Sequence, residues 1–223
     1  MTNTLHYYEK KYPHIMGIFL TLMSLLYYKY KMLGFIISVI AVLLGFLLYY
    51  TDGYLITTIV KIYLVNIISF LMFYKLNFKS KININYLLTI LLVINVFVLI
   101  FSVVENPFAN NHITNKFLAF CFLMVVLSTP LVSVSNNKIK ITKKFTNVNA
   151  YIILYTISIG YYYIVNPHTA YHKYLHLFSL IIPFISHFTN NRWLETRCLC
   201  LCLIFIYDLI DKINYMPFIS IYS

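Results

Sequence analysis

The sequence predicts an all-α protein, a polytopic bundle of about eight transmembrane helices that leaves no room for a soluble domain. Composition is the first reason: 61% of the 223 residues are hydrophobic and only 10% are charged, whereas soluble domains average about 45–50% apolar and about 25% charged residues. The second reason is that the apolar runs are continuous rather than alternating, which favours helices over strands. The third is that lysine-rich and lysine-poor loops alternate between these runs, as in multi-pass membrane proteins.

Eight apolar runs can each supply a helix, because a membrane-spanning helix needs about 20 mostly apolar residues. We expect these helices over residues 15–28, 33–50, 54–74, 86–104, 117–135, 148–165, 172–188 and 197–212. Together they form a single integral membrane domain over residues 1–223. The first and last runs are short, so a bundle of seven helices is the alternative. The polar N-terminus, with Glu9, Lys10 and Lys11, shows no cleavable signal peptide pattern.

The polar breaks between these runs differ in charge. Those after the first, third, fifth and seventh runs are rich in cations: Lys29, Lys31, Lys75, Lys79, Lys81, Lys138, Lys140, Lys143, Lys144, Arg192 and Arg197. The other side of the predicted bundle holds fewer: Lys10, Lys11, Lys116, Lys173 and Lys212. The positive-inside rule makes the first set cytoplasmic. The odd-numbered loops are then cytoplasmic, and the N-terminus is non-cytoplasmic.

Acids and histidines gather on the opposite, non-cytoplasmic side. The acids there are Glu9, Asp52, Glu105, Asp208 and Asp211. The histidines there are His6, His14, His112, His168, His172 and His176. Only Glu195 and His187 fall on the basic side. Chemistry that needs carboxylates or imidazoles is therefore expected near the non-cytoplasmic face.

His168, His172 and His176 repeat every four residues, so in a helix their imidazoles share one face. Imidazole is a common zinc ligand, but the outer two of this row lie about 12 Å apart along a helix. A zinc site would therefore take His172 and His176 together with His112, and Asp208 would act as base toward a metal-bound water. The alternative is that the histidines lie among lipid headgroups.

Four ionisable residues are candidates for an ion or solute path: Lys61, Asp52, Glu105 and Asp208. Ionisable groups inside a span are costly and usually face a cavity or a partner. Lys61 lies about 10 Å from the outer end of its span, so snorkelling to the interface is its alternative role. Asp208 follows a run of apolar and cysteine residues, and a hydrated helix end is the alternative for its carboxylate.

The segment 190–197 is the densest polar run beside a span. It is typical of an anchor where a helix enters the bilayer, and the alternative is a lipid headgroup or phosphate contact through Arg192 and Arg197. Three cysteines follow directly: Cys198, Cys200 and Cys202. Their spacing scatters them around a helix and excludes a single metal-binding face. We expect buried free thiols, with S-palmitoylation as the alternative.

Three functions are compatible with this sequence. The first is non-enzymatic, namely handling of a small solute or ion, or membrane organisation, and the lack of a complete catalytic set favours it. The second is an intramembrane zinc-dependent hydrolase acting on lipid. The third is an interaction module that uses the basic loop 136–147. The lipid bilayer is the expected partner rather than nucleic acid, because membrane proteins keep lysines on cytoplasmic loops. A homo-oligomer is compatible with the pattern.

Overall fold

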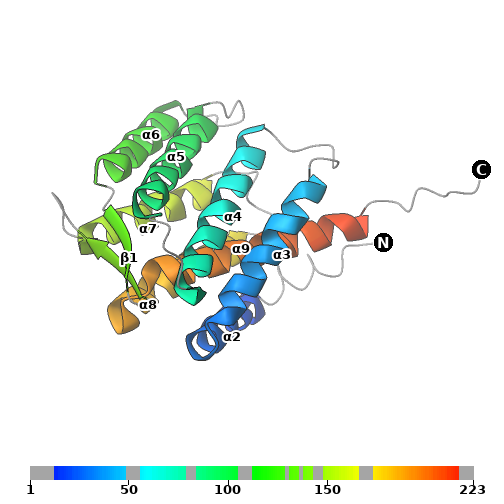
Figure 1. Cartoon of the computed structure of the whole chain (residues 1–223). Coiled ribbons are helices and arrows are strands. Elements are labelled where there is room, and N and C mark those ends of the chain that lie inside the picture. The colour runs from blue at the N-terminus through cyan, green and yellow to red at the C-terminus, as the bar shows by residue number, and fades with distance from the viewer. Residues whose placement is uncertain are drawn as a thin grey trace, which may run out of the picture.

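A computed structural model describes residues 13–48, 56–78, 84–104, 112–128, 131–135, 138–142, 148–165 and 173–215. Over these residues the chain forms eight helices and one two-stranded antiparallel sheet (Figure 1). The helices are α2 (Pro13–Lys29), α3 (Met32–Leu48), α4 (Ile56–Asn77), α5 (Asn85–Val104), α6 (His112–Leu127), α7 (Val148–Val165), α8 (Lys173–Asn190) and α9 (Trp193–Tyr215). The strands are β1 (Leu131–Ser135) and β2 (Lys138–Thr142). The predicted all-α class is confirmed.

Each described helix occupies the region of one predicted apolar run. The shortest helix, α6, has 16 residues and the longest, α9, has 23. Their continuous Leu, Ile, Val and Phe content explains why they form, since it leaves few breakers inside the runs. Taken one at a time, none of these helices, over the residues described, combines the length and the apolarity that a membrane crossing requires.

The region predicted as one helix over residues 117–135 differs most from expectation. α6 ends at Leu127, and Ser128 donates hydrogen bonds to the carbonyls of Met124 and Val125 in its last turn. Pro130 follows in the sequence, and a proline removes a backbone donor and disfavours helix in the residue before it. The chain then continues as β1, which pairs antiparallel with β2 in the register Val132↔Ile141.

Neighbouring helices run in alternating directions through the bundle. The C-terminal end of α2 lies beside the N-terminal end of α9, because Tyr28 Oη is 3.0 Å from Thr196 Oγ1. The C-terminal end of α8 lies beside the start of α7, because His187 Nε2 is 2.8 Å from Asn149 Oδ1. These contacts place the ends of α2 and α8 at the same end of the molecule as the starts of α7 and α9.

The hairpin and the α3–α4 pair complete this end. Asn77 Nδ2, at the end of α4, donates to the carbonyl of Lys31 just before α3, at 3.4 Å. The backbone N–H of Val134 in β1 donates to Asn85 Oδ1 at the start of α5, at 3.0 Å. We call this end the basic end and define it by Lys29, Lys31, Lys75, Arg192 and the β1–β2 hairpin. The predicted grouping of these cations on one side agrees with the helix directions.

α9 forms the centre of the bundle. It packs against α2, α3, α4 and α8, and Figure 1 shows it passing behind α3 and α4. Most of its residues from Trp193 to Leu209 are buried. The Trp193 ring meets the rings of Tyr151 and Tyr155 edge-on, at 5.8 and 5.0 Å between centroids. A helix that is surrounded by other helices is expected to carry apolar side chains on all its faces. α9 departs from this, because its buried residues include Glu195, Thr196 and Arg197.

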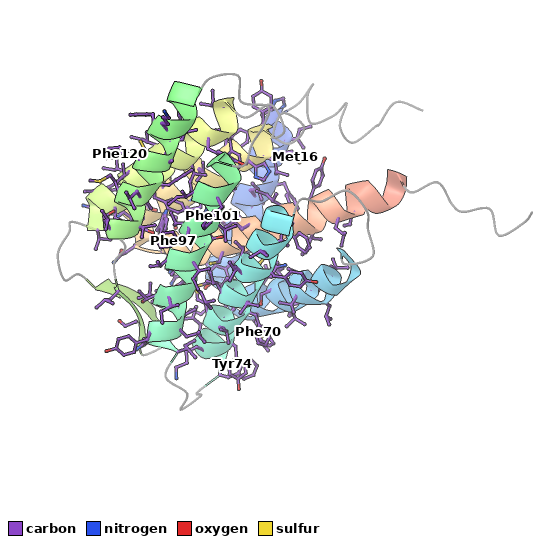
Figure 2. All side chains as sticks on the ribbon, turned by 90° about the horizontal axis from the view of Figure 1, so that it is seen from above. Met16, Phe70, Tyr74, Phe97, Phe101 and Phe120 are labelled. Carbon is purple, nitrogen blue, oxygen red and sulfur yellow. The ribbon has the colours of Figure 1, made fainter. Side chains whose placement is uncertain are left out.

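The outer surface of the bundle is largely apolar. Leu127 is 70% exposed, Ile157 65% and Leu43 60%, and these residues lie on three different helices. Figure 2 labels Phe97 and Phe101 along α5, which lies toward the viewer; both are exposed. Further large apolar side chains are exposed on every described helix, among them Ile18, Leu22, Leu25, Ile67, Phe117, Phe120, Leu123, Ile181, Ile185 and Ile210.

Candidate functional site

Polar side chains gather inside the bundle around the first turns of α9. We call this group the α9 polar cluster and define it by these residues: Tyr27, Tyr28, Ser179, Ser186, Glu195, Thr196 and Arg197. Glu195, Thr196 and Arg197 come from α9, and all three are buried. Ser179 and Ser186 come from α8, whose end turns directly into α9, and the two tyrosines come from the end of α2. The short turn at Asn191 and Arg192 brings these segments together.

Glu195 is joined to α2 by a charge-assisted hydrogen bond. Tyr27 Oη donates to Glu195 Oε2 at 2.7 Å, and Glu195 is only 6% exposed. The carboxylate also lies in the first turn of α9, where the helix dipole favours negative charge. A hydrogen bond to an ionised acceptor is about twice as strong as one between neutral groups. These two features compensate part of the cost of burying this acid.

A triangle of hydroxyl groups lies next to Glu195. Thr196 Oγ1 is 3.0 Å from both Tyr28 Oη and Ser186 Oγ, and Tyr28 Oη is also hydrogen-bonded to Ser186 Oγ. The Arg192 guanidinium carbon lies 5.1 Å from the centroid of the Tyr28 ring, which is within cation–π range. Three helices, α2, α8 and α9, therefore meet through hydroxyl groups at the basic end.

Arg197 is a cation held inside the bundle. It is 3% exposed, and its Nη1 donates to the Ser179 carbonyl at 2.8 Å and to Ser179 Oγ at 2.7 Å. Its guanidinium carbon is 5.9 Å from the centroid of the Tyr155 ring. Its Nε is buried without a hydrogen-bond partner among the described residues. A buried donor that lacks a partner costs about 1–3 kcal/mol, which offsets part of what the other contacts of Arg197 contribute.

The two buried charges of α9 face different neighbours. Residues two apart in a helix are rotated by about 200° around its axis, and the contacts agree with this, since Glu195 meets α2 whereas Arg197 meets α8. Chemically, the arrangement offers a carboxylate that can hold a proton or a cation and, across the helix, a guanidinium that can hold an anion.

Three cysteine side chains follow the polar residues along α9. Cys200 Sγ lies 4.0 Å from Ser24 Oγ, and Cys202 Sγ donates to Asn66 Oδ1 at 3.9 Å. Asn66 Nδ2 in turn donates to the Ala41 carbonyl at 3.1 Å. Cys198, Cys200 and Cys202 are free and buried, which confirms the prediction of buried free thiols.

The predicted zinc ligands are described only in part. His176 lies in α8, where its ring stacks on Tyr163 at 4.4 Å between centroids. His172 lies outside the described residues, and His112 begins α6 but its side chain is not among those described. Among the described residues, no group of three or more His, Cys, Asp or Glu is placed to hold a metal ion. The zinc site on these residues and Asp208 stays a prediction.

The predicted ion path also falls largely outside the described part of the chain. Asp52 and Glu105 lie outside it, and Lys61 and Asp208 lie in α4 and α9 without a described side chain. Their roles therefore stay predictions. Of the basic loop 136–147, the part from Lys138 to Thr142 forms β2.

The two arginines predicted to contact lipid headgroups are in different environments. Arg192 is partly exposed at the basic end, whereas Arg197 is enclosed and donates to Ser179. Helix α9 begins at Trp193 rather than at residue 197, so residues 193–197 belong to the buried part of this helix. Arg197 is therefore enclosed in the bundle and is not available at the surface. The prediction of an anchor at the surface is therefore wrong for Glu195 and Arg197, which are both buried. The available signal was the short break around Asn191 between two apolar runs.

The chain was compared with protein-family models, with curated proteins and with solved structures, and none of the three comparisons finds a match. The α9 polar cluster and the apolar surface of the bundle are therefore the features from which a function can be inferred.

Proposed function

We propose that the chain is a multi-pass integral membrane protein that handles a small ion or solute without catalysing a reaction. The observation that carries this proposal is the distribution of polarity: the bundle has an apolar exterior and encloses charged and hydroxyl side chains around α9.

The exterior supports contact with lipid. Monomeric soluble proteins rarely expose continuous apolar patches larger than a few hundred Å², yet this bundle exposes large apolar side chains on every described helix, with Leu127, Ile157 and Leu43 each at 60% or more. Acyl chains solvate such side chains without cost. Membrane bundles also enrich Ser, Thr and Asn between helices, as at Ser69 and Asn66, which are both buried.

The interior supports ion or solute handling. Burying an ion costs several kcal/mol unless partners compensate it, and Arg197 keeps a buried Nε without a hydrogen-bond partner among the described residues. Ionisable groups kept inside a membrane protein usually serve a proton, an ion or a substrate. Glu195 and Arg197 are therefore the residues we propose for this role, together with the predicted path residues Lys61 and Asp208.

The basic end supports an orientation. The described cations Lys29, Lys31, Lys75 and Arg192 share that end, and Lys116 lies near the start of α6 at the other end. Under the positive-inside rule, we propose that the basic end is cytoplasmic, which leaves the N-terminus on the non-cytoplasmic side.

Membrane integration is tested by extraction of the expressed chain. We expect the protein to stay with the membrane pellet in alkaline carbonate and to be released only by detergent. Release by carbonate alone would show a peripheral protein and would overturn the membrane proposal.

Ion handling is tested in liposomes that contain the purified protein. Fluxes of protons, K⁺ and Cl⁻ are measured for the wild type, for Glu195→Gln and Arg197→Gln, and for the control Lys116→Gln, whose side chain is exposed. We expect a flux that falls to the level of empty liposomes in one of the first two variants and persists in the control. Wild-type flux equal to that of empty liposomes, for these ions and for a panel of small solutes, would contradict this role.

A further inference from the structure

The described residues of the basic end include four cations that are exposed or partly exposed. Lys29 is exposed, and Lys31, Lys75 and Arg192 are partly exposed. Among the described residues of this end, Glu195 is the one acid, and it is buried and hydrogen-bonded to Tyr27. The described residues of this end therefore carry net positive charge.

Aromatic rings hold two of these cations in place. Lys29 Nζ lies 5.4 Å from the centroid of the Tyr30 ring, and the Arg192 guanidinium carbon lies 5.1 Å from that of Tyr28. Tyr28 is itself fixed by its hydrogen bond to Thr196. Holding a cation in one position lowers the entropy lost on binding an anion. The planar guanidinium of Arg192 is also well suited to phosphate oxygens.

Exposed aromatic residues surround the same end. Tyr30 is 55% exposed at the end of α2, and Tyr86 is 73% exposed at the start of α5. Phe78, exposed just after α4, contacts the rings of Phe35 and Tyr74, both at 5.1 Å. Aromatic residues are enriched where a membrane protein meets the headgroup layer. Cations and aromatic residues thus share the level at which headgroups would lie.

The hairpin adds basic positions beside these residues. The backbone N–H groups of Val132 and Val134 donate to Thr89 Oγ1 and Asn85 Oδ1, both at 3.0 Å, and so attach β1 to the start of α5. β2 pairs with β1 and carries two lysines, which lie opposite Ser135 and Ser133 in the register. The basic end is therefore built from α2, α4, the turn between α8 and α9, and the hairpin.

We propose that the basic end is a binding surface for the headgroup phosphates of anionic phospholipids, and that these lipids stabilise the folded bundle. This inference rests on the proposed membrane location. Clusters of four to eight cations next to the membrane attract anionic lipid, with a contribution that falls off within a Debye length. The four cations that define the basic end, namely Lys29, Lys31, Lys75 and Arg192, reach that range.

The test compares thermal unfolding of the protein in two kinds of nanodisc. One contains phosphatidylcholine alone, and the other contains phosphatidylcholine mixed with phosphatidylglycerol. We expect the anionic discs to raise the wild-type Tm by roughly 2–4 °C for each cation engaged. The shift should shrink in Lys29→Gln/Arg192→Gln and persist in the matched control Lys116→Gln. Lys29→Gln/Lys75→Gln is a second variant that leaves the contact between Arg192 and Tyr28 intact.

Several outcomes would overturn the inference. No Tm difference between the two discs for the wild type would do so, as would an equal loss of the shift in Lys116→Gln, which would indicate general surface charge. Inorganic phosphate added to the phosphatidylcholine discs separates lipid from free anion, because an equal shift with phosphate alone would show a phosphate site. Carbonate extraction decides the membrane proposal independently, so a protein that stays in the membrane but shows no lipid preference would refute this inference alone.

Discussion

Tyr27 and Glu195 are separated by 168 positions in the sequence and are joined by a hydrogen bond of 2.7 Å between phenol and carboxylate. This bond connects α2 with α9, the first and last helices of the described chain. Tyr27 is completely buried, and its ring also meets Phe73 of α4 edge-on at 5.3 Å between centroids. Three helices therefore depend on the position of this one side chain.

Removal of the Tyr27 hydroxyl should destabilise the fold. In Tyr27→Phe the Glu195 carboxylate stays buried but loses its donor, which costs about 1–3 kcal/mol. Tyr30→Phe is the matched control, because Tyr30 directly follows the same helix and is 55% exposed. Denaturant unfolding of the detergent-solubilised protein measures both free energies. The double variant Tyr27→Phe/Glu195→Gln should lose less free energy of unfolding than the two single variants lose together, because the two groups contact each other. Equal unfolding of Tyr27→Phe and Tyr30→Phe would show that the bond contributes nothing measurable.

Two glycines on α3 should respond oppositely to alanine. A Cβ at Gly34 would lie 2.7 Å from Phe73 Cε1 and 2.9 Å from Tyr27 Cε2, and both rings are fully buried. A Cβ at Gly45 would meet Tyr63 no closer than 3.6 Å. We expect Gly34→Ala to lose about 1–3 kcal/mol of stability through overpacking, and Gly45→Ala to gain up to about 1 kcal/mol from helix propensity. Thermal unfolding of the two variants beside the wild type measures this; a Gly34→Ala protein as stable as Gly45→Ala would contradict the close approach of α2, α3 and α4.

Most of the helical layout could be predicted because apolar runs and charged breaks are local signals. The hairpin could not be found by counting apolar residues, since Leu131, Val132 and Val134 resume the apolar run of α6 after only three residues. The alternation of Val and Ser in β1, and of Lys and Ile in β2, was a period-two signal. Pro130 was the other signal, because a proline removes a backbone donor and tends to kink or break a helix.

The turn between α8 and α9 should depend on the residue at position 191. Asn191 has φ 54°, and the backbone N–H groups of Asn191 and Arg192 donate to the carbonyls of His187 and Ser186. The bond from Asn191 to His187, four residues back, is that of an αL motif, in which the residue after the helix is left-handed. A β-branched residue is strained in that conformation, so Asn191→Val should lose about 1–2 kcal/mol.

The control for this change is Asn190→Val, because Asn190 is exposed within α8. Asn191→Gly should be as stable as the wild type or slightly more stable, because glycine adopts positive φ without steric cost. Chemical denaturation compares the three variants. A tolerant Asn191→Val would indicate that α8 does not end in this motif.

The α9 polar cluster was harder to predict than the helices. Sequence identified segment 190–197 as polar and placed it at a surface, because charged residues beside an apolar run usually lie in water or among headgroups. Burial of Glu195 and Arg197 depends on which helices surround α9, and that is decided by packing between segments distant in sequence. The tight turn at Asn191 then starts α9 four residues before the predicted start, so the charges enter the interior.

The four cysteines should differ in their reactivity toward a thiol reagent. Cys198, Cys200 and Cys202 are buried in α9, whereas Cys121 in α6 is partly exposed. A buried thiol reacts only when the structure opens locally or globally. N-ethylmaleimide should therefore add to Cys121 first in the folded, detergent-solubilised protein, and to the other three only as the protein unfolds. Mass spectrometry counts the adducts, and Cys121→Ser should remain unlabelled until denaturant is added.

Burial also argues against S-palmitoylation of the α9 thiols, since an acylating enzyme cannot reach them. Acyl groups released by hydroxylamine from these cysteines, or their rapid labelling in folded Cys121→Ser, would show that the start of α9 is accessible and would contradict its central position in the bundle.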